Sequence, residues 1–144
     1  MNSNIKKDIL SILSDELDTY RVMLVKTSEQ IDVINKMDMT GLQSILHEKD
    51  LCVNRIESTE KKIALLMKQA SQDLFHDGDI LSCLRDIKNT INNIITAEED
   101  CYAELSLLQA GISDKILQSD NRIQAAKAYN TSAIPVPRFS DIIS

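Results

Sequence analysis

Apolar side chains recur at alternating spacings of three and four residues through most of the chain. The first series lies within residues 5–37, and its positions are Leu10, Leu13, Leu17, Tyr20, Leu24, Thr27, Ile31 and Ile34. A three-four repeat places its members along one face of an α-helix and is typical of helices that pack in coiled-coil fashion. The pattern therefore predicts one long helix over this segment.

A second series of the same kind predicts a helix from about residue 40 to residue 74. Two N-caps fit its start: Thr40, paired with Gln43 in a capping box, or Asp38. The series consists of Leu42, Ile45, Lys49, Cys52, Ile56, Thr59, Ile63, Leu66 and Ala70. Its two polar members, Lys49 and Thr59, are predicted to help fix the register of the packed helices.

A third helix is predicted over residues 80–110, after a turn in which Gly78 supplies backbone freedom and Asp79 a helix cap. Its apolar face consists of Ile80, Leu84, Ile87, Ile91, Ile94, Glu98, Cys101, Leu105 and Leu108. Gly111 is a residue at which this helix can end, and Ser113 has the character of an N-cap for a fresh segment.

The lengths of these segments predict the architecture. Each holds about 30–35 residues, or roughly 45–50 Å at 1.5 Å per residue. Only 3 Gly and 2 Pro occur in 144 residues, so few turns are available. Short turns make consecutive helices antiparallel. We therefore predict an all-α fold in which residues 1–112 form an antiparallel, coiled-coil-like bundle of three long helices.

The C-terminal part departs from this scheme. Residues 113–129 can form an amphipathic helix whose stripe is Ile116, Leu117, Ile123, Ala126 and Tyr129. Residues 130–144 contain two prolines and are predicted to be a flexible tail. The stripe either folds back as a fourth core helix or binds a helix of another protein. The pattern favours binding, because the three matched helices complete a bundle without it.

Composition narrows the range of partners. The net charge is -6 and aromatic residues make up 3% of the chain, which disfavours nucleic-acid binding. The chain lacks the basic excess of a membrane-surface helix, a signal peptide and an apolar run long enough to span a bilayer. Its three cysteines form no C-x-x-C pair, as expected of free thiols in a reducing compartment. We expect a cytoplasmic protein without stable membrane insertion.

Motifs for catalysis are absent from the sequence. It has no glycine-rich phosphate loop, no G-x-S-x-G and no H-E-x-x-H. His47 and Asp50 alone supply too few ligands for a metal site. Cys101 is expected to be a buried thiol. Glu98 on the apolar face is expected to reach solvent or to pair with a lysine. We predict no catalytic residue, no metal site, no cofactor and no enzymatic activity.

The order of features resembles the flagellar export chaperone family typified by FlgN. A Leu-rich first helix, a turn leading into the second helix, and a closing P-R-F-x-D carry the resemblance, which covers most of the chain. The matching residues are Leu13, Leu17, Tyr20 and Leu24, then Asp38, Leu42, Leu46 and Lys49, and finally Pro137, Arg138, Phe139 and Asp141.

The resemblance implies a small acidic chaperone without ATPase activity. Such a protein would hold the C-terminal helices of hook-filament junction (hook-associated) proteins, prevent their premature association and deliver them to the cytosolic domain of the export gate. Carried over by position, client contact falls on Leu105, Leu108, Ile112, Ile116, Leu117 and Ile123, and docking on the export gate falls on Tyr129.

Two other functions fit the same pattern. One is a secretion chaperone with a different client. The other is a structural coiled-coil adaptor or oligomerisation module, which would self-associate through an exposed apolar face and would not need the C-terminal part.

Overall fold

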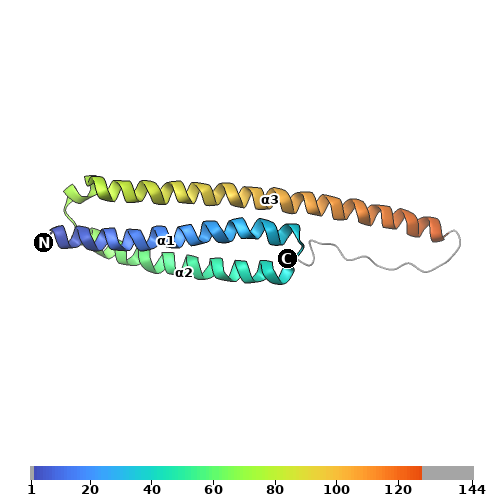
Figure 1. Cartoon of the computed structure of the whole chain (residues 1–144), viewed down its shortest axis with the longest axis horizontal. Coiled ribbons are helices and arrows are strands. Elements are labelled where there is room, and N and C mark those ends of the chain that lie inside the picture. Colours follow the sequence, from blue (N-terminus) through green and yellow to red (C-terminus); the bar gives the residue numbers. More distant parts are fainter. Residues whose placement is uncertain (1, 128–144) are drawn as a thin grey trace. The chain divides into compact units, whose positions relative to one another are not determined.

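The computed structural model describes residues 2–127, with side chains from Asn4 onward. Within this range the chain is helical and contains no strand, which confirms the all-α prediction. Its elements are α1 (Asn2–Asn35), α2 (Met39–Gln69), the short 3₁₀ helix η1 (Gln72–His76) and α3 (Gly78–Lys127) (Figure 1). The predicted tail, 130–144, and Tyr129 lie outside the described residues.

The chain divides into two compact units, Met1–Cys101 and Tyr102–Ser144. Helix α3 contributes to both units, since it runs without interruption from Gly78 to Lys127. In the first unit α1, α2 and the first part of α3 pack as three antiparallel helices, as the sequence predicts (Figure 1).

Apolar side chains from all the elements of the first unit form its core. The buried members come from α1, η1 and α3: Ile9, Leu13, Leu17, Leu74, Ile80 and Ile87. Helix α2 adds partly buried Ile63, Leu66, Met67 and Ala70. Each fully buried Leu or Ile contributes about 1.5–3 kcal/mol relative to an exposed one. Most of these residues occupy predicted three-four positions, but Ile9, Leu74 and Met67 do not. At the start of α1 the fully buried residue is Ile9, and the predicted Leu10 is only partly buried.

The turn between α1 and α2 depends on a side-chain cap. The Asp38 carboxylate accepts a hydrogen bond from the Gly41 N–H at 2.9 Å, so Asp38 rather than Thr40 is the N-cap. Met37 takes the left-handed conformation with φ 54°. A Cβ at Gly41 would collide with the capping carboxylate and lie 3.2 Å from a Val33 methyl. A side chain at this position would therefore displace the carboxylate that caps α2.

The second turn differs from the prediction in two ways. Helix α2 ends at Gln69 instead of residue 74, because Ala70 is extended and η1 follows. Helix α3 is capped by Asp77 and not by Asp79: one Asp77 carboxylate oxygen accepts from the N–H groups of Asp79 and Ile80 at 2.9 and 3.2 Å. Gly78 does not take a positive φ, so its expected backbone freedom is not used.

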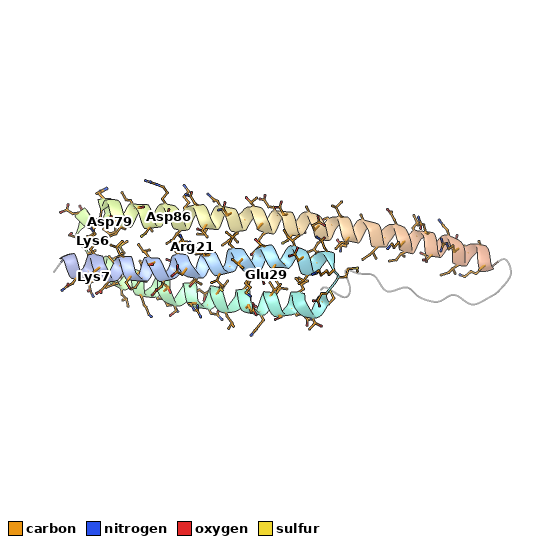
Figure 2. The ribbon with its side chains drawn as sticks, in the orientation of Figure 1. Lys6, Lys7, Arg21, Glu29, Asp79 and Asp86 are labelled. Carbon is orange, nitrogen blue, oxygen red and sulfur yellow. The ribbon has the colours of Figure 1, made fainter. Side chains whose placement is uncertain are left out.

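Lys6 links this turn to the start of α1. Its ammonium lies 2.9 Å from the Asp77 carboxylate. It also lies 3.1 Å from the carboxylate of Asp79, and Figure 2 labels both Lys6 and Asp79. These carboxylates raise the pKa of Lys6, and the Lys6 ammonium lowers the pKa of Asp77. The capping residue is thus also an ion-pair partner.

The predicted helix end at Gly111 is wrong. Gly111 lies inside α3 with open space around its Cα, and Ser113 is an interior helical residue. Glycine in a helix interior costs about 1 kcal/mol relative to alanine, which is too little to stop a helix of this length. Residues 113–127 continue α3 without a turn and so form no separate fourth helix.

We expect Glu16→Gln to stabilise the first unit at neutral pH. Burial raises the pKa of the Glu16 carboxyl, and the Glu60 carboxylate raises it further. Because the folded-state pKa exceeds the unfolded value near 4.5, the charged form costs stability above the raised pKa, and this cost disappears as the pH falls toward 4.5. The gain should be roughly 0.5–1 kcal/mol at pH 7 and should shrink on acidification.

Urea unfolding at pH 7 and at pH 4.5 measures this effect. The control is Glu57→Gln, which makes the same change at an exposed position of α2. A loss of stability at pH 7 in Glu16→Gln would contradict the prediction, because it would mean that the charged carboxylate is held favourably.

Candidate functional site

An apolar stripe runs along α3 in the second unit. Its positions recur at spacings of three and four and are among the least exposed in residues 102–127. We define the α3 stripe as Leu105, Leu108, Ile112, Ile116, Ser119 and Ile123, all of which are partly exposed. At 1.5 Å per residue the stripe is about 27 Å long. Five of the six residues predicted to contact a client lie on it.

Leu117 is the predicted contact that the structure separates from the others. It follows Ile116 by one residue, which is about 100° around a helix. Its exposed fraction is 61%, and Leu107, which also lies off the α3 stripe, is 68% exposed. Leu117 therefore belongs to a different side of α3 from the five stripe residues.

Charged residues border the α3 stripe and form no ion pair with other described residues. Glu104 and Arg122 lie 18 residues apart, which is five full turns, so they occupy the same flank. Among the described residues, neither makes an ion pair or a side-chain hydrogen bond. Both side chains are therefore free to meet charges on a partner.

This arrangement is suited to binding an amphipathic helix. An apolar stripe bordered by charges offers a partner helix a surface to bury and polar groups to fix its orientation. Burial contributes about 25 cal/mol per Å², from which the cost of ordering both surfaces is subtracted. Within residues 2–127 no group of three His, Cys, Asp or Glu side chains is placed to hold a metal ion.

A second notable cluster is polar and lies inside the first unit. Lys49 of α2 donates to the Gln30 amide oxygen of α1 at 2.9 Å and pairs with the Glu98 carboxylate of α3. The Thr27 hydroxyl lies 3.5 Å from Glu98 and donates to the Met23 carbonyl at 2.8 Å. The cluster thus joins three helices. It confirms that Glu98 pairs with a lysine.

Cys101 completes this cluster as a buried thiol, as predicted. Its exposed fraction is 1%, and its sulfur lies 3.5 Å from the Thr27 carbonyl oxygen, to which it donates. Burial raises the pKa of the Cys101 thiol and lowers the pKa of the Lys49 ammonium. A thiol with a raised pKa is less reactive, which fits a packing role.

Comparison with protein families adds an independent finding. Residues 1–133 match the FlgN protein family, so the match includes all of the first unit and the whole α3 stripe. The chain belongs to the FlgN family. The resemblance noted in the sequence is thereby confirmed, and FlgN membership supports a general role as a flagellar export chaperone that binds flagellar proteins. No curated protein and no solved structure matches the chain.

No helix in the described part of the chain is long and apolar enough to cross a membrane.

Proposed function

We propose that this FlgN-family protein is a cytoplasmic chaperone of flagellar type III export that binds the C-terminal helices of hook-filament junction proteins. It prevents their premature association and delivers them to the cytosolic domain of the export gate. It acts by binding alone, without catalysis.

The observation that carries this proposal is the α3 stripe. Apolar residues at helical spacing, bordered by charges that no described residue engages, are the features that an amphipathic client helix requires. Membership of the FlgN family supports clients from the flagellum. Client contact is assigned to Leu105, Leu108, Ile112, Ile116 and Ile123. Leu117, which lies on another side of α3, is tested separately by substitution.

Calorimetric titration of the full chain with C-terminal peptides from the host's hook-filament junction proteins tests the proposal. We expect saturable binding with a micromolar or lower dissociation constant. Absence of binding by a folded protein would reject these clients and favour a different secretion client or a structural adaptor.

Tyr129→Ala tests delivery separately from client binding. Since Tyr129 is assigned to gate docking, we expect the variant to bind the peptide as the wild type does while its binding to the cytosolic domain of the export gate weakens. Titration of the same preparation with both ligands makes the measurement. Loss of peptide binding with retained gate binding would reverse the assignment.

A further inference from the structure

We propose that a groove between α1 and α2 binds an amphipathic helix of another protein, which carries basic residues along one flank and acidic residues along the other. The groove lies wholly within the first unit and shares no residue with the α3 stripe. It is therefore a second site for a helical partner, and the inference does not rest on the function proposed above.

Two adjoining hollows define this groove, which we call the α1/α2 groove. The first holds about 400 Å³ and is lined by side chains within residues 8–12 of α1 and 62–66 of α2. The second holds about 340 Å³ and is lined from residues 15–22 and 55–62. Lys62 lines both hollows, so they form one groove between two helices that run side by side (Figure 1). Its length, residues 8–22 of α1, is about 21 Å and matches about four turns of a partner helix.

The groove offers apolar surface to such a helix. Leu65 and Val22 are exposed, and Ile12 and Leu66 are partly exposed. These side chains come from both helices, so a helix that lies between α1 and α2 reaches them with a single apolar face. The partner would pack as a further helix against the bundle.

The two walls of the groove carry opposite charges. The α1 wall holds Asp8 and Asp15, and the α2 wall holds Arg55 and Lys62. Among the described residues, none of these four side chains makes an ion pair. A helix with basic residues toward α1 and acidic residues toward α2 is complementary to both walls. Nucleic acid is not, because its phosphates would meet the carboxylates of α1.

The next position along the same edge of α1 shows where the groove ends. Lys26 follows Val22 by four residues, and its ammonium lies 2.7 Å from the Glu48 carboxylate of α2. Opposite charges therefore pair between α1 and α2 where their side chains meet. Asp15 and Lys62 line the same hollow and do not pair. The space between them is free for the side chains of a third helix.

Three designed peptides test the groove in the full chain. Each has about 18 residues, is held helical by a side-chain cross-link and carries the same row of leucines at three-four spacing. The mixed peptide has lysine along one flank and glutamate along the other; the second peptide has lysine on both flanks, and the third has glutamate on both. The NMR shift of the Ile12 methyl groups reports binding at the groove itself.

We expect the mixed peptide to shift the Ile12 methyl groups with a dissociation constant on the order of tens of micromolar. Each same-sign peptide should bind about fivefold more weakly, because it places like charges against one wall.

Lys62→Glu makes the α2 wall acidic at its centre and should reverse this preference. The mixed peptide should bind about fivefold more weakly than to the wild type, and the peptide with lysine on both flanks about fivefold more tightly. Lys61→Glu is the matched control. It changes the net charge equally, but it lies about 100° around α2 and does not line the groove, so it should leave the preference unchanged.

Several outcomes would overturn the inference. Ile12 methyl groups that do not shift at millimolar peptide, or equal responses to Lys61→Glu and Lys62→Glu, would exclude a charge-matched helix in this groove. Shifts of Ile12 with protein concentration alone would show that a second copy fills it. Nuclear Overhauser contacts from Ile12 to residues 128–144 in the free protein would show that the chain's own C-terminal segment does.

A hook-filament junction peptide separates this inference from the proposed function. It should shift Ile112 and leave Ile12 unchanged, and the mixed peptide should bind the resulting complex as tightly as the free protein. A junction peptide that shifts Ile12 would make the groove part of the client site and overturn the inference. If the junction peptide fails to bind while the mixed peptide passes the Lys62→Glu test, the function is rejected and the inference stands.

Discussion

Ile116→Asp is expected to weaken binding of a hook-filament junction peptide by about 100-fold, while Leu117→Asp changes it by less than about threefold. Ile116 lies near the middle of the α3 stripe, so a carboxylate there would be buried against the client helix without a partner. Leu117, one residue later, is 61% exposed on another side of α3. The two substitutions introduce the same charge into adjacent positions of the same helix.

This neighbouring pair separates a specific contact from a general effect on α3. Calorimetric titration gives the affinities, and circular dichroism checks that both variants keep the helicity of the wild type. Equal losses at both positions would extend the site around α3 to Leu117. A loss at Leu117 alone would move the site off the α3 stripe.

The sequence predicted the helices well because their packing has a simple period. The buried positions of α2, such as Ile45 and Cys52, are all ones that the three-four repeat selects. In α1 the repeat selects the buried Leu13, Leu17, Thr27 and Ile34 but not the buried Ile9, Glu16, Thr19 and Gln30. A helix that buries one face has apolar residues at regular three-four spacing in its sequence. This spacing continues past Cys101, so five of the six predicted contact residues lie on one face of α3.

The helix ends were predicted less well because they depend on local backbone chemistry. Leu74 is in phase with the face of α2 and is buried, yet it belongs to η1. Periodicity does not distinguish a continuing helix from a short 3₁₀ turn that places its apolar residue in the same core. Asp77 and Asp79 are both suitable caps, and the choice between them depends on where the first helical N–H groups lie.

The error at Gly111 has a different origin. A glycine followed by a serine is a common signal for a helix end and a new start. At Gly111 the apolar spacing continues through the signal, from Leu108 to Ile112 and Ile116. A helix interrupted only by one glycine loses about 1 kcal/mol, so the continuing pattern outweighs it.

The partners within the polar cluster depend on register between helices. The three-four spacing identifies Lys49 and Glu98 as polar residues on apolar helix faces. Their pairing, and the part that Gln30 and Thr27 play, require the antiparallel alignment of α1, α2 and α3. A single sequence gives the faces of the helices but not the axial positions of one helix against another.

Glu98→Ala is expected to lower the free energy of unfolding by about 2–3 kcal/mol, whereas Lys49→Met should change it by less than about 1 kcal/mol. The asymmetry follows from burial, since the side chain of Lys49 is 11% exposed and that of Glu98 is 42% exposed. Removal of Glu98 leaves a buried ammonium with Gln30 as its described partner. Removal of Lys49 leaves a carboxylate that water can reach, and methionine fills the space of the lysine stem.

Denaturant unfolding of the two single variants and of the double variant measures this asymmetry, with Glu99→Ala as an exposed control on the same turn of α3. The double variant should be more stable than Glu98→Ala, because it no longer buries an unpaired charge.

Burial lowers the pKa of Lys49 below 10.5, so the folded state binds fewer protons than the unfolded state in the window beneath that value. The difference in free energy of unfolding between the wild type and Glu98→Ala should therefore shrink as the pH rises toward 10.5. If Lys49→Met is as unstable as Glu98→Ala, the prediction is wrong. That result would show that the ion pair itself stabilises the bundle, and that the loss in Glu98→Ala does not come from one unpaired buried charge.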